Sequence, residues 1–282
     1  MKKVLTVLLS AALIVAMALS LTACSKSEKV KVIDIELTEE DYAFAIQKGN
    51  TALLDEVNAY LAESKASGAL NTLINSYFNG EATFSYKNKT NTPATGDFVV
   101  ATNAYFPPFE SYNDDSAFYG VDIEIAYNIA QRLGKNLFIK DMDFDGIIDD
   151  VKNGDSDIGM AGITVDDTRK IKVDFADGYY TSAQVIVVRE GDTTFDGCTS
   201  VEDVEAILKA KTSSYIIGTQ AGTTGYMYSH GDEDFGYEGF GVNTKAYNTG
   251  ALAMTDLSNG KINAVILDKQ PALMIAKKIN KK

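Results

Sequence analysis

Residues 137–161 read LFIKDMDFDGIIDDVKNGDSDIGMA and contain a strand, a helix and a second strand in direct succession. The apolar run 137–140 has the length of a buried strand, and 147–152 is a short helical segment that Gly154 ends. Residues 157–161 then predict the next strand. Strands that alternate with helices predict an α/β fold in which helices cover a sheet.

The alternation continues on both sides of this stretch. Upstream, residues 98–101 predict a strand and 122–133 an amphipathic helix, because Ile125, Ile129 and Leu133 recur at every fourth position. The polar residues 81–96 predict a linker. Downstream, the pattern predicts strands over 184–188, 215–219 and 262–267 and helices over 201–210, 250–257 and 271–278. In a chain of 282 residues this pattern predicts two α/β lobes.

The composition excludes several functional classes. With 45% hydrophobic residues the chain can bury a sizeable core, which argues against disorder. A formal charge of -13 argues against nucleic acid as a partner, because phosphates require clustered cations. One His and two Cys leave little material for a His-based metal site or a disulfide scaffold, so no metal and no cofactor are expected.

Residues 1–24 predict export and attachment to a membrane. Two lysines precede the uncharged apolar run 4–21, which ends in Leu-Thr-Ala-Cys at 21–24 and resembles a bacterial lipobox. This layout predicts a signal peptide over 1–23, a lipid on Cys24 and a tether over 24–31. The expected location is the extracytoplasmic face of the bacterial cell membrane, with the lipid anchor as the protein's membrane contact. The alternative is an uncleaved membrane helix, since about 20 apolar residues span a bilayer.

Eight short motifs carry a family resemblance. They are ATNAYFPPFE (101–110), YGVD (119–122), DFDGI (143–147), MAGIT (160–164) with Arg169, VDF (173–175), YY (179–180), GTQAGTT (218–224) and AVILD (264–268). In this order and spacing they resemble the family 3 extracellular solute-binding proteins, the amino-acid receptors of ABC importers. The resemblance implies a two-lobed, type II periplasmic-binding-protein-like fold that closes on its ligand and has no enzymatic activity.

The order of the segments departs from that family. Members continue after the motif ending at Asp268 into a crossing strand and further helices, and a segment of that kind stands at the front here, over 39–78. The chain therefore resembles a natural circular permutant, with 33–80 as the family's C-terminal segment and 97–187 as its N-terminal part. Lobe 1 would span 32–187 and lobe 2 188–282, with one connection near 188–191. The alternative is an unrelated helical extension on a truncated binding protein.

The resemblance also implies a site for an amino-acid zwitterion. Arg169 matches the carboxylate clamp, for which a planar guanidinium supplies two parallel hydrogen bonds. Thr164 and Thr224 would be further donors. Asp268 matches the acceptor of the α-ammonium group, with the Gly162 carbonyl and the Thr164 hydroxyl beside it.

Further residues would surround the ligand side chain. Phe106 and Phe144 match an aromatic pair, and the remaining expected binding residues are Asn103, Glu110, Ala161, Gln220 and Thr223. An amide both donates and accepts hydrogen bonds, so Asn103 favours a polar, uncharged ligand. Glu110 and Gln220 could accommodate a basic side chain, so a basic amino acid is the alternative ligand.

The expected function is capture of a free amino acid by hinge closure and its delivery to the permease subunits of an ABC importer. Two other classes stay open. Cyclohexadienyl dehydratases share the fold, and Glu110 is the candidate general acid for such chemistry. A sensory ligand-binding module is the third possibility. Residues 141–146 copy the start of a calcium loop, but Lys152 stands where calcium requires a Glu, so no metal site is expected there.

Overall fold

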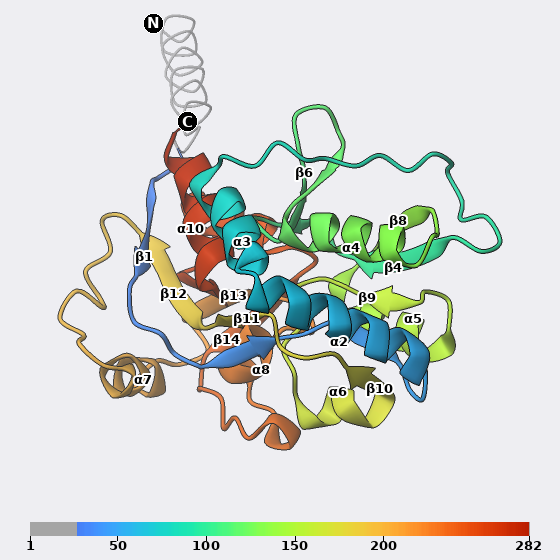
Figure 1. Ribbon diagram of the computed structural model, residues 1–282. Coiled ribbons are helices and arrows are strands. Elements are labelled where there is room, and N and C mark those ends of the chain that lie inside the picture. The colour runs from blue at the N-terminus through green and yellow to red at the C-terminus, as the bar shows by residue number, and fades with distance from the viewer. Residues whose placement is uncertain (1–26, 282) are drawn as a thin grey trace, which may run out of the picture.

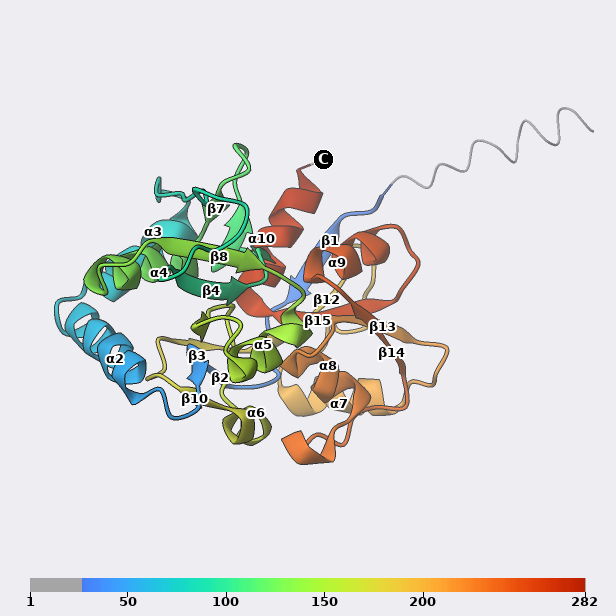
Figure 2. The same cartoon turned by 90° about the vertical axis from the view of Figure 1, so that its right-hand side faces the viewer.

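Two five-stranded sheets form the centres of two lobes in a computed structural model that describes residues 27–281 (Figure 1). Figure 2 shows the lobes side by side, with α2 (Thr51–Ala66) and α4 (Val121–Arg132) on one and α7 (Val201–Lys209) and α9 (Gly250–Ser258) on the other. The predicted signal peptide and Cys24 lie outside the described residues. Within 27–281 no helix is long and apolar enough to cross a membrane.

Lobe 1 is built on a mixed sheet. In spatial order its strands are β10 (Val173–Phe175), β3 (Ala45–Gln47), β9 (Ile158–Gly159), β4 (Phe98–Thr102) and β8 (Leu137–Asp141). Strand β4 runs parallel to β8 and β9, and β3 is antiparallel to β9 and β10. Its other elements are α2 (Thr51–Ala66), α3 (Ala69–Asn79), α4 (Val121–Arg132), η1 (Phe144–Gly146), α5 (Ile147–Asn153), α6 (Asp167–Lys172) and the small sheet β5 (Tyr105–Phe106), β6 (Glu110–Tyr112), β7 (Phe118–Tyr119).

Lobe 2 has a second mixed sheet. Its strands are β1 (Val30–Ile33), β12 (Gln184–Arg189), β15 (Ala264–Asp268), β13 (Ile216–Gln220) and β14 (Asn243–Tyr247), in that spatial order. The elements around it are α7 (Val201–Lys209), α8 (Thr224–His230), η2 (Glu233–Phe235), α9 (Gly250–Ser258) and α10 (Lys269–Asn280). Every residue of β15 is buried, as expected for an apolar strand in the middle of a covered sheet.

The predicted strands and helices from residue 98 onward are confirmed, with ends that differ by a few residues. In α4 the predicted apolar face is buried, including Ile125 and Ile129. Helix α8 and strand β14 are among the elements that the sequence pattern does not predict. Helix α8 is short and begins with Thr-Gly, and β14 has exposed and half-buried side chains only, so neither has a strong apolar period.

The chain crosses between the lobes twice. Strand β1 pairs antiparallel with β12, from Val30 beside Arg189 to Ile33 beside Ile186, and therefore belongs to lobe 2. The chain then passes through β2 (Glu40–Tyr42) into lobe 1 and returns through β11 (Tyr180–Ser182), which pairs antiparallel with β2. The predicted boundaries at 32–187 and 188–282, and the single connection at 188–191, are therefore wrong. The reason is that the VKVI segment of β1 completes the edge of the second sheet.

The predicted linker 81–96 runs along the outside of lobe 1. The side chain of Asn88 pairs with both backbone polar groups of Ile139 on the edge strand β8, at 2.7 and 2.8 Å. Tyr86 forms an isolated antiparallel bridge with Phe118. These contacts fix the path of the linker against the sheet edge without adding a strand to it.

Candidate functional site

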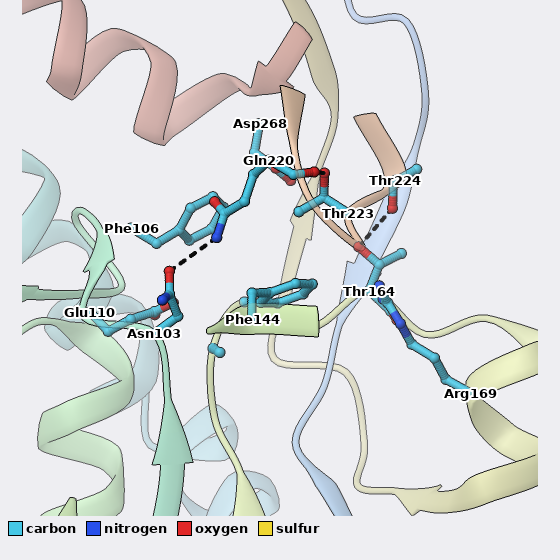
Figure 3. A pocket seen from close by; sticks show the side chains of 12 residues that line it. Asn103, Phe106, Glu110, Phe144, Thr164, Arg169, Gln220, Thr223, Thr224 and Asp268 are labelled. Atoms are coloured by element: carbon cyan, nitrogen blue, oxygen red, sulfur yellow. Dashed lines mark hydrogen bonds between the residues drawn. The ribbon is translucent and has the colours of Figure 1, made fainter. Parts of the chain in front are cut away.

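One pocket between the lobes is lined by all the residues that the sequence predicted as ligand-binding (Figure 3). They are Asn103, Phe106, Glu110, Phe144, Ala161, Gly162, Thr164, Arg169, Gln220, Thr223, Thr224 and Asp268. Many follow the ends of central strands: Asn103 follows β4, Ala161 follows β9, Gln220 ends β13 and Asp268 ends β15. The carboxyl ends of strands in α/β sheets are the usual place for ligands.

The lobes are closed around this pocket, which leaves room for about one water molecule. Several hydrogen bonds cross from lobe to lobe. The Gln220 amide donates to Asn103 at 3.0 Å, the Thr224 hydroxyl donates to that of Thr164 at 3.3 Å, and Arg169 donates to the Gly222 carbonyl at 2.9 Å. A ligand can therefore enter only if some of these bonds are exchanged for bonds to the ligand.

Arg169 is the cation of the pocket. It lies at the start of α6, where Asp166 caps the helix and pairs with the Arg169 Nε at 3.1 Å. Its other nitrogens donate to the Thr164 carbonyl at 2.6 Å and the Gly222 carbonyl, and its guanidinium lies 5.6 Å from the centre of the Phe144 ring. Burial lowers the pKa of Arg169, and the charge of Asp166 opposes that shift. Asp166 thus orients the guanidinium from outside the pocket.

Asp268 lies in the opposite lobe and is also buried. Burial and, second, the charge of Glu40 raise its pKa to about 7. The Tyr42 hydroxyl donates a hydrogen bond to its Oδ1. Neither Glu40 nor Tyr42 was singled out as a binding residue from the sequence. The polar run TEEDY at 38–42 gave no sequence signal of this role, and the structure buries the side chains of Glu40 and Tyr42 while Asp41 is exposed.

Gly162 is required at the bottom of the pocket by close packing. Its φ of +55° is in the left-handed region, and a Cβ there would lie 2.8 Å from the Phe106 ring and 3.2 Å from the Tyr42 ring. Its amide donates to Asp122 Oδ2 at 3.1 Å, and the Tyr179 hydroxyl donates to Asp122 Oδ1 at 2.7 Å. The buried Asp122 therefore fixes the peptide of Gly162 beneath the pocket.

Glu110 and Asp122 form an acidic corner. Glu110 is fully buried, and neither of its carboxyl oxygens accepts a hydrogen bond from a residue in the described part of the chain. Burial, and then the charges of Asp122 and Asp268, raise its pKa well above the ordinary value. Burial raises the pKa of Asp122 to about 7. Two carboxyl groups that are buried side by side disfavour the ionised form of at least one of them.

Asn103 differs from Glu110 in having a hydrogen bond at each end of its side-chain amide. Its Nδ2 donates to the Met142 carbonyl at 2.8 Å, and its Oδ1 accepts from Gln220. The neighbouring Asp141, in the stretch that copies a calcium loop, accepts from the Ala104 amide and the Tyr112 hydroxyl at 2.9 and 3.0 Å. Across residues 27–281, no group of three or more His, Cys, Asp or Glu is arranged to hold a metal ion.

The chain is similar to known amino-acid-binding proteins. Residues 98–280 match the sequence model of the bacterial extracellular solute-binding proteins, family 3. The L-cystine-binding protein TcyJ of Escherichia coli K12 is 27% identical over 185 residues, which cover 66% of this chain and 64% of that protein. The matched part is thus less than two thirds of that relative's length.

Solved structures give the same result. An ancestral arginine-binding protein bound to arginine aligns with a TM-score of 0.55 and 35% identity, over 65% of this chain and 74% of that one. The ancestral amino acid-binding protein AncCDT-1, a precursor of cyclohexadienyl dehydratase, aligns with a TM-score of 0.55 and 29% identity, over 64% of this chain and 74% of that one. In both alignments about a quarter of the other chain is left unmatched.

Proposed function

The chain belongs to the bacterial extracellular solute-binding proteins of family 3, and from this premise we propose that it captures a free amino acid between its lobes. One observation carries the proposal: the buried Arg169 and the buried Asp268 line a single pocket from opposite lobes. An amino acid carries a carboxylate and an ammonium group on the same carbon. These two buried side chains of opposite charge can satisfy both groups at once.

Binding is coupled to closure in this proposal. The ligand carboxylate takes hydrogen bonds from Arg169 and from the Thr224 region of lobe 2, and the ammonium group bonds Asp268 and the Thr164 hydroxyl. Each end of the ligand then contacts both lobes. A ligand with contacts on both sides binds the closed form better than the open form and shifts the population toward closure.

We propose a basic amino acid, such as arginine, as the ligand. The preference for an uncharged ligand rested on Asn103, but the Nδ2 of that amide already donates to the Met142 carbonyl within lobe 1. Glu110 is instead a buried carboxyl group beside Asp122 that accepts no hydrogen bond from residues 27–281. A buried carboxyl group in this state is costly, and a cationic side chain would stabilise it. Similar proteins named as arginine-binding support this choice.

We further propose that the chain is a circular permutant of its family. The family match begins at residue 98, yet the residues before it supply β3, an internal strand between β9 and β10 of lobe 1. They also supply β1 and one of the two crossings between lobes. If these residues were an unrelated extension, the sheet of lobe 1 would be complete without them, whereas β3 lies inside it.

The proposed cellular role is delivery of the ligand to the permease of an ABC importer. A lipid on Cys24 would hold the protein on the extracytoplasmic face of the cell membrane. Metabolic labelling with a fatty acid tests this part: the label should be present in the wild type and absent in Cys24→Ala. Labelling that persists in Cys24→Ala would contradict the predicted anchor.

Calorimetric titration with the twenty amino acids and cystine tests the binding function. We expect one-to-one binding of L-arginine or another basic amino acid by ligand-stripped protein. Arg169→Ala should weaken binding about a hundredfold, or about 3 kcal/mol, because a charged double hydrogen bond is lost. Arg132→Ala is the control, since Arg132 pairs with Glu56 and Glu63 on the surface of lobe 1.

Two results would contradict parts of the proposal. Folded wild-type protein that binds no amino acid would remove the binding function. Tighter binding of glutamine than of arginine would contradict the choice of a basic ligand. Glu110→Gln tests the same choice, because it should weaken arginine binding more than glutamine binding.

Because one similar structure is a precursor of a dehydratase, the same protein should be incubated with prephenate and arogenate, and product formation would favour the enzyme.

A further inference from the structure

Strand β2 brings two buried polar side chains to the edge of the pocket from a part of the chain outside the family match. Glu40 is 4% exposed and Tyr42 is fully buried, and both lie at the crossing between the lobes. Each one contacts a residue that the proposed function assigns to the ligand's ammonium group. Glu40 contacts Thr164 and Tyr42 contacts Asp268.

Glu40 accepts hydrogen bonds from three donors. Its Oε2 accepts from the Thr164 hydroxyl at 2.6 Å, and its Oε1 accepts from the Thr38 hydroxyl at 2.6 Å and the Gln184 amide at 3.0 Å. A carboxylate has no proton to give, so in each of these bonds the partner donates. The only proton of the Thr164 hydroxyl is therefore directed to Glu40.

With its proton used, the Thr164 hydroxyl can only accept further hydrogen bonds. Its oxygen accepts a weak hydrogen bond from the Thr224 hydroxyl at 3.3 Å and keeps one lone pair. It can meet an N–H group of the ligand but cannot donate to a carboxylate. Glu40 thus makes Thr164 an acceptor.

Tyr42 acts in the same sense on Asp268. Burial, and then the charges of Asp268 and Glu40, raise the pKa of Tyr42 well above its ordinary value, so the hydroxyl keeps its proton. The Tyr42 hydroxyl donates a hydrogen bond to Asp268 Oδ1. This hydrogen bond stabilises the ionised form of Asp268 and leaves its other lone pairs free to accept. The Tyr42 ring is held in place by Phe109, with ring centres 5.2 Å apart and nearly perpendicular planes.

We propose that Glu40 and Tyr42 are positioning residues that set Thr164 and Asp268 as acceptors for the α-ammonium group of the ligand. This inference rests on the proposed function. It adds a role that the family match, which begins at residue 98, does not cover. Since both residues lie on one short strand, the crossing segment itself carries the specificity for an α-amino group.

The test compares two ligands that differ only in that group. L-arginine and its des-amino analogue 5-guanidinopentanoate share the carboxylate and the guanidinium side chain. Their dissociation constants are measured at pH 8, where Asp268 is mostly ionised, by calorimetry with competition for the weaker ligand, on wild-type protein, Glu40→Gln and Tyr42→Phe. We expect both variants to weaken L-arginine binding at least tenfold and to change 5-guanidinopentanoate binding less than threefold.

A matched control comes from the same pair of strands. Thr181 on β11 bonds the exposed Asp41 at 3.0 Å and is not among the residues that line the pocket, so Thr181→Val should leave both dissociation constants unchanged. Equal weakening of both ligands in Glu40→Gln and Tyr42→Phe would overturn the inference, because a merely structural role affects both alike. Unchanged L-arginine binding in both variants would overturn it as well. Wild-type protein that binds neither ligand nor any other amino acid would instead refute the proposed function, and this inference with it.

Discussion

The side-chain amide of Asn280 pairs with both backbone polar groups of Val30. Its Oδ1 accepts from the Val30 amide at 2.9 Å, and its Nδ2 donates to the Val30 carbonyl at 2.8 Å. The end of α10 is thereby joined to the start of β1, although the two residues are 250 positions apart in sequence. In Figure 1 these two segments lie together at one end of the molecule. The outer edge of β1 has no neighbouring strand in the sheet, and this side chain satisfies the two backbone groups of Val30 there.

Removing this amide should destabilise lobe 2. We expect Asn280→Ala to lower the free energy of unfolding by about 1 to 2 kcal/mol, because two partly buried backbone groups lose their partner. Urea denaturation of ligand-free protein measures the change. Asn91→Ala, at an exposed position of the linker, is the control and should have no measurable effect. Equal stability of the two variants would show that solvent replaces the Asn280 bonds without cost.

The same contact makes a rearranged chain possible. If the chain is a circular permutant, a variant that begins at residue 97, runs to 281, continues through a short Gly-Ser linker into residue 28 and ends at 80 should fold. Because Val30 and Asn280 are adjacent, the linker has little distance to cover. We expect the circular dichroism spectrum and the ligand affinity of the native order to be retained, within about threefold. A variant that fails to fold, even with longer linkers, would contradict the permutation.

Closure of the lobes depends on a glycine in lobe 2 that touches lobe 1. Gly222 has a φ of +71°, and a Cβ there would lie 2.8 Å from the Cβ of Asp145. We expect Gly222→Ala to weaken ligand binding at least tenfold, because the added methyl group holds the lobes apart. Small-angle X-ray scattering should show a smaller ligand-induced contraction than in the wild type.

Gly260 provides a control with the same backbone cost. Its φ is +72°, and no atom lies within 4 Å of the position of its Cβ. Gly260→Ala should lose a similar amount of stability and keep the wild-type affinity. If both variants bind as well as the wild type, the close approach of Gly222 to Asp145 does not limit closure.

The sequence predicted the pocket better than the path of the chain. The pocket residues stand at strand ends or in motifs with strong local patterns, such as Asp268 after the apolar run 264–267. The role of Glu40 and Tyr42 could not be predicted, because the run TEEDY at 38–42 has the composition of an exposed segment. Its burial depends on pairing with β11, far downstream in the sequence. The lobe boundary was missed for the same reason: β1 is a short strand whose partner β12 is distant in sequence.

Ligand affinity should rise with pH between 5.5 and 8. In the ligand-free protein the pKa of Asp268 is about 7, raised by burial and then by the charge of Glu40. The α-ammonium group of the ligand requires the ionised carboxylate, so binding below pH 7 must displace a proton. Protonated Asp268 cannot accept a charged hydrogen bond, and each unit of pH below the pKa should weaken binding by up to about tenfold.

Calorimetry at pH 5.5, 6.5, 7.5 and 8 measures this dependence, and two buffers of different ionisation enthalpy reveal the released proton. Tyr42, which bonds Asp268, keeps its proton over this range, because burial and the charges of Asp268 and Glu40 raise its pKa. Arg169 remains a cation, as guanidinium groups do in proteins. Burial also raises the pKa of Asp122 to about 7. Asp122 lies behind Gly162 and accepts a hydrogen bond from the Gly162 amide, so Asp122→Asn should preserve most of the pH dependence of the affinity. Asp268→Asn should bind weakly at every pH and have a smaller slope than the wild type, with the remainder coming from Glu110 and Asp122, whose pKa values burial also raises. A wild-type affinity that is constant from pH 5.5 to 8, with no proton released, would show that Asp268 is ionised throughout and would contradict the prediction.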